Sequence, residues 1–430
     1  MADKIVQPRE LVGTEYVDLV MNKCKNAVAN GNIYDNFRTL AFSFNKFLNP
    51  EVYASNDTNG LEYRARVTMT NGILFSLGDR LRWSEDGKNW TNAITPTYYF
   101  TSLPIYANGL FVALAQTYFA WSSDGKTWTN GTTISSGMTY LQVIYANGVF
   151  VAGGKTDKTA WSSDGKTWTF SESIGSSGRY IYLAYGNGAF VAVCPTGAWW
   201  SSDGKTWTRG EQESSLVGEI TYVNNLFFIL PSDEKAIWWS SDGKTWTKGT
   251  NPVSTALYLP IYANGLFIAG GSPEILWSSD GKTWTAGTGI SPDPDLTVST
   301  ANTPIYANGL FVAGTTSFSK DSVWWSSDGK TWTKPITSLP DSIRGKPVFA
   351  NGIFLIGTGG LGGAGAKLMW SVDASTWYEC SSSETGFWSD PVYINGMFFS
   401  RGRSTTEDYT SLMYIPPSLD YGVDKLLNFD

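Results

Sequence analysis

Eight aspartates that recur at one position of a repeated word are the most regular candidates for chemistry in this chain of 430 residues. The nine-residue word WSSDGKTWT, called the box below, begins identically at Trp121, Trp161, Trp200, Trp239, Trp277 and Trp325, and weaker copies begin at Trp83 and Trp370. The box aspartates are Asp86, Asp124, Asp164, Asp203, Asp242, Asp280, Asp328 and Asp373. Aspartate in a tight turn accepts backbone N–H bonds, so we expect these side chains to shape turns and not to bind metal.

The rest of the composition removes the commonest catalytic schemes. The chain has no histidine, which excludes Ser-His-Asp and Cys-His nucleophiles and His-ligated zinc. Its three cysteines, Cys24, Cys194 and Cys380, are far apart and lack Cys-x-x-Cys spacing, so we expect neither a metal cluster nor a disulfide framework. We therefore predict no catalytic residues, no metal and no cofactor, and any catalysis would have to use carboxylates, Lys, Tyr or Arg.

The net charge and the hydropathy of the chain limit the kinds of partner that it can bind. The net charge of −7 argues against a long nucleic-acid footprint, so we predict no nucleic-acid partner. The start MADKIVQPRE has no apolar stretch behind a basic one, and no segment approaches the length of a membrane span. We expect a chain without signal peptide or transmembrane segment, made in the cytoplasm and not inserted into a membrane.

The boxes lie 38 to 48 residues apart, and a second word recurs between them. PIYANGLF is identical at Pro104, Pro260 and Pro304, and related Asn-Gly words bracket every box. Asn-Gly is the strongest two-residue hairpin signal because a type I′ turn needs positive φ at both central positions. With Asp-Gly taken as a second I′-type turn, each repeat contains four short strands, at residues 105–107, 110–113, 120–123 and 126–129 in one example. Four antiparallel strands per repeat predict a β-propeller blade.

Tryptophan is the most over-represented side chain. Of the 20 tryptophans, 19 lie in or immediately before a box. Because they recur in every unit, we expect them to fill the space between neighbouring blades and not to form a sugar platform.

The box resembles the Asp-box repeat of sialidase-like propellers, whose pattern Ser-x-Asp-x-Gly-x-Thr-Trp lies at the turn between the third and fourth strands of a blade. Ser122, Asp124, Thr127 and Trp128 match it, but Gly125 directly follows the aspartate, so this loop is one residue shorter. The resemblance covers residues 61 to about 415 and implies architecture, since in that family the boxes are structural. The family's catalytic arginine triad and Arg-Ile-Pro motif have no counterpart that matches residue by residue.

We predict an all-β fold, a β-propeller of eight to nine four-stranded blades preceded by a short helical segment. Residues 1–60 contain two runs of apolar residues at helical spacing and form the anchoring segment. Residues 61–415 form the propeller, with a partial last repeat at 391–415, and residues 416–430 form a tail. A nine-bladed ring, in which residues 51–54 supply a missing outer strand, and eight blades with an added hairpin remain alternatives.

Antiparallel strand order places both turns of each blade on one face and the variable loops and blade-to-blade links on the other. Loops on a rigid scaffold carry function, so we expect the binding surface on this variable face. The candidates are Tyr98, Tyr99, Phe100, Tyr118, Arg179, Tyr180, Phe318 and Trp388. Trp388, the one tryptophan outside the boxes, equally fits a cap on the last blade.

Three functions remain open. The near-identical blades behind a helical start resemble proteins of tailed-bacteriophage particles, which implies a non-enzymatic virion component. Such a protein would attach to other virion proteins through residues 1–60 and present its variable loops to a host-surface glycan or protein. The alternatives are a sialidase-like glycoside hydrolase and a lectin-like surface propeller.

Overall fold

The computed structural model describes residues 66–415, apart from 78–79, 88, 96–98, 136–137, 177–178, 212–215, 232–235, 251–257, 272–274, 290–303, 315–322, 338, 340–342, 351, 359–366, 380–385, 395–396 and 405–409. The predicted helical segment 1–60 and the tail 416–430 lie outside this part. The chain divides into two compact units. Arg64–Thr288 is called the six-sheet unit, and Met1–Tyr63 together with Gly289–Asp430 is called the three-sheet unit.

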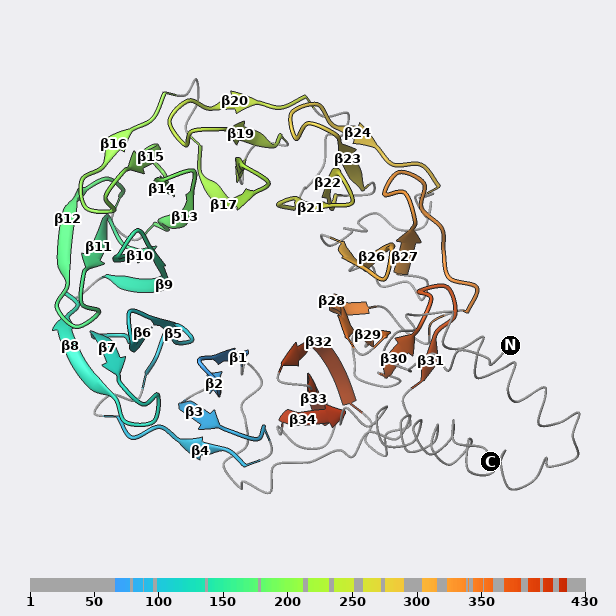
Figure 1. The fold of residues 1–430 in the computed structure, drawn as a ribbon, viewed down its shortest axis with the longest axis horizontal. Coiled ribbons are helices and arrows are strands. Elements are labelled where there is room, and N and C mark those ends of the chain that lie inside the picture. The colour runs from blue at the N-terminus through green and yellow to red at the C-terminus, as the bar shows by residue number, and fades with distance from the viewer. Residues whose placement is uncertain are drawn as a thin grey trace, which may run out of the picture. The chain divides into compact units, whose positions relative to one another are not determined.

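The six-sheet unit consists of four-stranded antiparallel sheets that follow one another along the chain (Figure 1). Their strands are β1 Arg66–Thr70, β2 Ile73–Leu77, β3 Leu81–Ser84 and β4 Thr91–Asn92; β5 Ile105–Ala107, β6 Leu110–Leu114, β7 Tyr118–Ser122 and β8 Thr129–Thr133; β9 Thr139–Ala146, β10 Val149–Lys155, β11 Lys158–Ser162 and β12 Thr169–Ser173; β13 Tyr182–Gly186, β14 Ala189–Cys194, β15 Gly197–Ser201 and β16 Thr208–Arg209; β17 Gly218–Val223, β18 Leu226–Pro231, β19 Trp238–Ser240 and β20 Thr247–Lys248; β21 Ile261–Ala263, β22 Leu266–Ala269, β23 Leu276–Ser278 and β24 Thr285–Ala286. Within this unit the first strand of each sheet lies on the inner side of the row and the fourth on the outer side (Figure 1).

The three-sheet unit continues the same pattern. Its strands are β25 Ile305–Ala307, β26 Leu310–Gly314 and β27 Val323–Ser326; β28 Ile343–Ala350, β29 Ile353–Thr358, β30 Leu368–Ser371 and β31 Tyr378–Glu379; β32 Gly386–Ile394, β33 Met397–Ser404 and β34 Thr410–Ile415. In the first of these sheets, a single bridge between Trp325 and Thr333 stands where a fourth strand is expected.

Over the described residues the chain is all-β, as predicted, and the succession of antiparallel meanders is consistent with a β-propeller. Seven of the described sheets have four strands and two have three, β25–β27 and β32–β34. No helix in the described part is long and apolar enough to cross a membrane.

The Asn-Gly hairpin turns have the predicted backbone. Asn108 and Gly109 join β5 to β6 with φ of 51° and 77°, the two positive values that a type I′ turn requires. Where the repeat has Asn-Asn instead, Asn224 and Asn225 keep both values positive at 46° and 64°. Asparagine tolerates the left-handed region better than other residues with a side chain, so the hairpin survives the loss of glycine.

The prediction of a second two-residue turn at Asp-Gly was wrong. The third strand β7 ends at Ser122 and the fourth strand β8 begins at Thr129, and only Gly125 between them has a positive φ, 72°. The loop is therefore longer than an I′ turn, and hydrogen bonds of the aspartate side chain close it, as described below.

The hydrophobic core lies between neighbouring sheets. Trp128 is buried among Phe75 of the preceding sheet and Phe100, with ring centroids 6.4 and 5.4 Å away. Trp168 stacks on Phe119 of its preceding sheet at 4.2 Å. The second box tryptophan is thus placed between sheets, because the wide indole fills a gap that aliphatic side chains leave open.

Candidate functional site

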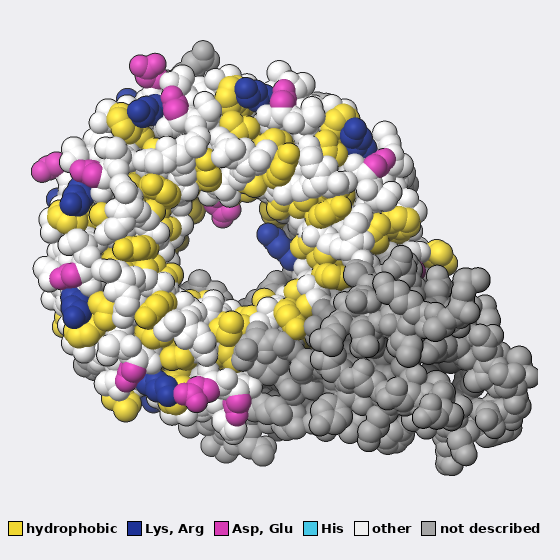
Figure 2. Space-filling model, viewed as in Figure 1, with side chains coloured by type: hydrophobic (Ala, Val, Ile, Leu, Met, Phe, Trp, Pro, Cys, Tyr) yellow, Lys and Arg dark blue, Asp and Glu magenta, His cyan; other side chains and the backbone are white. Residues whose placement is uncertain are grey.

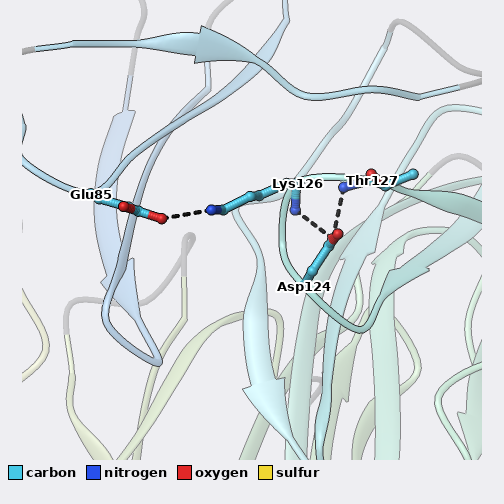
Figure 3. Close-up of polar contacts among 4 residues, drawn as sticks. All are labelled: Glu85, Asp124, Lys126 and Thr127. Carbon is cyan, nitrogen blue, oxygen red and sulfur yellow. Dashed lines mark hydrogen bonds and ion pairs between the residues drawn. The ribbon is translucent and has the colours of Figure 1, made fainter.

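The box aspartate closes its own turn. The Oδ1 atom of Asp124 accepts the backbone N–H groups of Lys126 and Thr127, each at 2.8 Å (Figure 3), and the Ser122 hydroxyl, also at 2.8 Å. The Ser122 Oγ in turn accepts the N–H of Gly125 at 2.8 Å. These bonds satisfy backbone donors that a loop between two strands would otherwise leave without a partner.

The same carboxylate bonds recur along both units. Backbone N–H groups two and three residues ahead donate to Asp164, Asp203, Asp242, Asp280, Asp328 and Asp373. In the first box, Asp86 accepts the N–H of Asn89 and, through its second oxygen, the Asn89 side-chain amide, both at 2.8 Å. Glycine is replaced in the last box by Ala374, which keeps a φ of 57°. All eight box aspartates therefore have backbone partners within their turns.

These hydrogen bonds favour the ionised carboxyl. The N–H of Thr127 is the largest influence on Asp124 and, with the Lys126 N–H and the Ser122 hydroxyl, holds its pKa below the usual 3.8, although burial acts in the opposite direction. At Asp164 burial is the largest influence and raises the pKa, but the hydrogen bonds together outweigh it and the pKa is lowered there too. The pKa is also lowered at Asp203, Asp242, Asp280 and Asp328. A carboxyl held ionised in this way is suited to a turn and not to general-acid work.

The repeated asparagines connect one sheet to the next. The side-chain amides of Asn108, Asn147 and Asn187 donate to the backbone carbonyls of Ser163, Ser202 and Ser241, at 3.4, 3.5 and 2.9 Å. Each acceptor is the second serine of the box in the following sheet. The two repeated turns therefore lie on the same face of the six-sheet unit and bond to each other across the boundary between sheets.

The box lysine makes a second contact between sheets. Its ammonium lies over the first box tryptophan of the preceding sheet, 4.1 to 4.6 Å from the ring centroid, in the pairs Lys126–Trp83, Lys166–Trp121, Lys205–Trp161, Lys244–Trp200 and Lys282–Trp239. Lys126 also forms an ion pair with Glu85 at 2.6 Å (Figure 3). On the face in Figure 2, basic and acidic side chains accordingly lie close together at intervals, beside hydrophobic ones.

A shallow depression of about 300 Å³ lies on this face between the fourth and fifth sheets. Asn187, Trp200, Asp242 and Lys244 help to line it. The Asn187 amide, the Asp242 carboxylate and the Lys244 ammonium are engaged in the contacts described above. The polar groups that line the depression are thus already bonded within the turns or across the boundary between sheets. Within the described residues no group of three or more Cys, Asp or Glu side chains could hold a metal ion.

Four of the predicted binding residues are not presented on a described loop surface. Tyr98 and Phe318 lie outside the described residues. Phe100 is buried, at 8% exposure, because its segment pairs with Ala115 of the same sheet and directs the ring against Trp128. Trp388 was placed in a link between blades, but its backbone belongs to strand β32 and pairs with Gly402.

The other four candidates lie at the ends of strands away from the Asn-Gly turns. Tyr99 is 66% exposed, Tyr180 is 45% exposed, Arg179 is exposed and Tyr118 is half-buried at the start of β7. Tyr118 begins β7 of the second sheet, and Tyr99 lies beside that sheet, where its carbonyl accepts the N–H of Gln116, whereas Arg179 and Tyr180 precede the fourth sheet. The structure therefore brings them together as pairs and not as one site.

Sequence reasoning missed two residues beside Tyr180. The ring of Tyr182, the first residue of β13, stacks on Tyr180 with centroids 5.8 Å apart and planes 26° apart. Burial, followed by the nearby charge of Glu219 on β17 and by Tyr180, raises the pKa of Tyr182. The alternation of Tyr180 and Tyr182 could have indicated one strand face, but the approach of Glu219 from a different sheet has no signal in the sequence.

Among known proteins, only solved structures are similar to this chain, since no protein family profile and no curated protein sequence matches it. Among solved structures, the computationally designed Ika8 protein is similar with 12% identity and a TM-score of 0.47, over 74% of this chain and 96% of that one. BamB from Moraxella catarrhalis is similar with 10% identity and a TM-score of 0.42, over 73% and 96%. YCF48 from Cyanidioschyzon merolae is similar with 11% identity and a TM-score of 0.39, over 76% and 98%.

Proposed function

We propose that this chain is a non-enzymatic scaffold and recognition protein, a component of a bacteriophage particle. In this proposal residues 1–60 attach it to other virion proteins. The variable ends of its sheets, opposite the Asn-Gly turns, meet a host-surface glycan or protein. The virion assignment is supported by the style of the repeats, since almost identical boxes that alternate with variable loops resemble those of tailed-bacteriophage proteins.

The main support for the scaffold role is that the polar side chains of the box already bind partners within the protein. The Asp242 carboxylate is engaged by the N–H groups of Lys244 and Thr245, and the Lys244 ammonium lies over Trp200. A polar group with its partners already in place inside the protein has little left to offer a substrate. The repeated words thus specify shape, which leaves recognition to the segments that vary.

A recognition surface is also supported by what the variable ends expose. Large aromatic side chains at rigid positions supply contact area with little loss of conformational entropy. Tyr99 and Tyr180 are two of the exposed aromatic residues at these ends of the six-sheet unit. Their backbones are tied to neighbouring segments through Gln116 and Lys155.

Particle composition tests the virion assignment. Particles purified from a lysate of a strain carrying this gene are examined by quantitative mass spectrometry. We expect the chain at a fixed ratio to the major capsid protein, and its absence from infectious particles would overturn the assignment. Turnover of fluorogenic glycosides by the purified full chain would overturn the non-enzymatic role and favour a glycoside hydrolase.

A further inference from the structure

A stacked pair of tyrosines with an acidic neighbour stands out at the variable end of the six-sheet unit. Tyr180 covers one face of the Tyr182 ring and is itself 45% exposed. Tyr182 is half-buried and packs against the core cluster between the fourth and fifth sheets. One aromatic ring is therefore held from below, while the other has a face available to a ligand.

The backbone under this pair is firmly held. Tyr180 pairs with Lys155 at the end of β10, Ile181 donates to Gly154 at 2.7 Å, and the Arg179 carbonyl accepts from Thr156 at 3.0 Å. Strand β13 is fixed in turn by Gln142 of β9, whose side-chain amide exchanges two bonds of 2.9 Å with the backbone of Leu183. A platform fixed in advance loses little entropy when a ligand binds.

An acidic side chain lies near the rings. Glu219 on β17 is exposed and close enough for its charge to affect the Tyr182 hydroxyl. A carboxylate accepts hydrogen bonds, so it can pair with the hydroxyl groups of a sugar, which donate them.

We propose that the Tyr180–Tyr182 pair, with Glu219 beside it, is a stacking site for a neutral pyranose ring of a glycan. This inference rests on the recognition role proposed above and names its ligand class. The flat C–H face of the sugar lies on the open face of Tyr180, and its hydroxyls reach Glu219. The negative charge of Glu219 disfavours acidic sugars, because their carboxylate would approach a like charge.

The test measures sugar binding by the full chain. Calorimetric titrations use the methyl glycosides of glucose, galactose, mannose and N-acetylglucosamine, with sialyllactose as the acidic probe. We expect at least one neutral glycoside to bind, and Tyr180→Ala to weaken it about tenfold or more. Tyr180→Phe, which keeps the ring, retains most of the affinity. Tyr262→Ala, which removes an exposed tyrosine beside an Asn-Gly turn of another sheet, leaves it unchanged.

The remaining outcomes separate this inference from the proposed function. Neutral-sugar binding that survives both Tyr180→Ala and Glu219→Gln would overturn the site, as would binding of sialyllactose alone or binding of none of these sugars. Each of these results leaves the particle-composition test untouched. Thermal unfolding of Tyr180→Ala at the wild-type midpoint shows that a loss of binding is local and not a failure to fold.

Discussion

The side-chain amide of Asn187 donates to the backbone carbonyl of Ser241 at 2.9 Å, across the boundary between two sheets of the six-sheet unit. Asn187 belongs to a hairpin turn, and Ser241 belongs to the box of the following sheet. The two repeated words of this chain are thus the two halves of one contact. The donor is a side chain and the acceptor a backbone carbonyl, so the contact accounts for the recurring asparagine and not for the serine of the box.

Replacing Asn187 with aspartate tests that contact. Aspartate also tolerates a positive φ, so the turn is kept, but its ionised carboxylate has no N–H to donate. We expect Asn187→Asp to destabilise the protein by about 0.5–1.5 kcal/mol, measured by urea unfolding. Asn71→Asp is the matched control, since Asn71 has a φ of 48° and, within the described residues, its amide makes no bond to the box of the following sheet. Equal effects of the two substitutions would contradict the role of the amide.

The box glycine is predicted to be required both for its positive φ and because a Cβ at its position would clash with the preceding sheet. Gly165 has a φ of 73°, and a Cβ there would lie 2.9 Å from the Val112 Cγ2 of the preceding sheet. Gly148 in the same sheet has a φ of 78° and no atom within 4 Å of such a Cβ. We expect Gly148→Ala to cost about 1 kcal/mol from the left-handed backbone alone, and Gly165→Ala about 2–4 kcal/mol. Similar unfolding free energies for both variants would show that the contact with Val112 is unimportant.

Low pH is expected to remove the contribution that the box aspartates make to the stability of the fold. The pKa of Asp124 is lower in the folded chain than its ordinary 3.8, so its contribution to stability is complete above about pH 5 and is lost as the pH falls through the folded value. Asp124→Asn should therefore be less stable than wild type at pH 7, with the gap in unfolding midpoint closing towards pH 3. The measurement is a series of urea midpoints between these pH values. A gap that stays constant or widens in acid is the contrary result.

The contact of Lys244 with Trp200 gives a separate prediction. Lys244→Met keeps most of the apolar stem and removes the ammonium that lies 4.1 Å from the ring centroid. We expect a loss of about 0.5–1 kcal/mol, and a smaller loss for Lys244→Arg, because a guanidinium also binds the face of an indole. Urea unfolding checks both. A methionine variant as stable as wild type would assign the contact to packing of the stem.

The fold was predictable where the sequence itself states the local geometry. Asn108-Gly109 indicates a hairpin because few residue pairs accept two positive φ values, and the structure confirms both. The prediction of a two-residue turn at Asp124-Gly125 was wrong, because it considered only which backbone angles these residues accept and not the hydrogen bonds of the aspartate side chain. The sequence does not reveal that the carboxylate reaches the N–H groups of Lys126 and Thr127 and so closes a longer loop.

The candidate site depended on contacts between distant segments, which sequence patterns do not report. Phe100 was expected on a surface, yet its segment pairs with Ala115 and buries the ring. Trp388 was expected in a link between blades, yet its backbone lies within β32 and pairs with Gly402. Glu219 approaches Tyr182 from a neighbouring sheet, and that pairing is set by packing between sheets and not by spacing in the chain.

The central claim is that the repeated words hold neighbouring sheets together while the opposite, variable ends of the sheets bind a ligand. One comparison tests this claim most directly. Wild type, Tyr180→Ala and Lys244→Met are applied to the same array of surface glycans, and the bound amount of each is measured. We predict that Lys244→Met binds as wild type does, because it alters only a contact between sheets, and that Tyr180→Ala loses the signal. Loss of binding in Lys244→Met with full binding in Tyr180→Ala would contradict the claim and move recognition to the face of the repeated words.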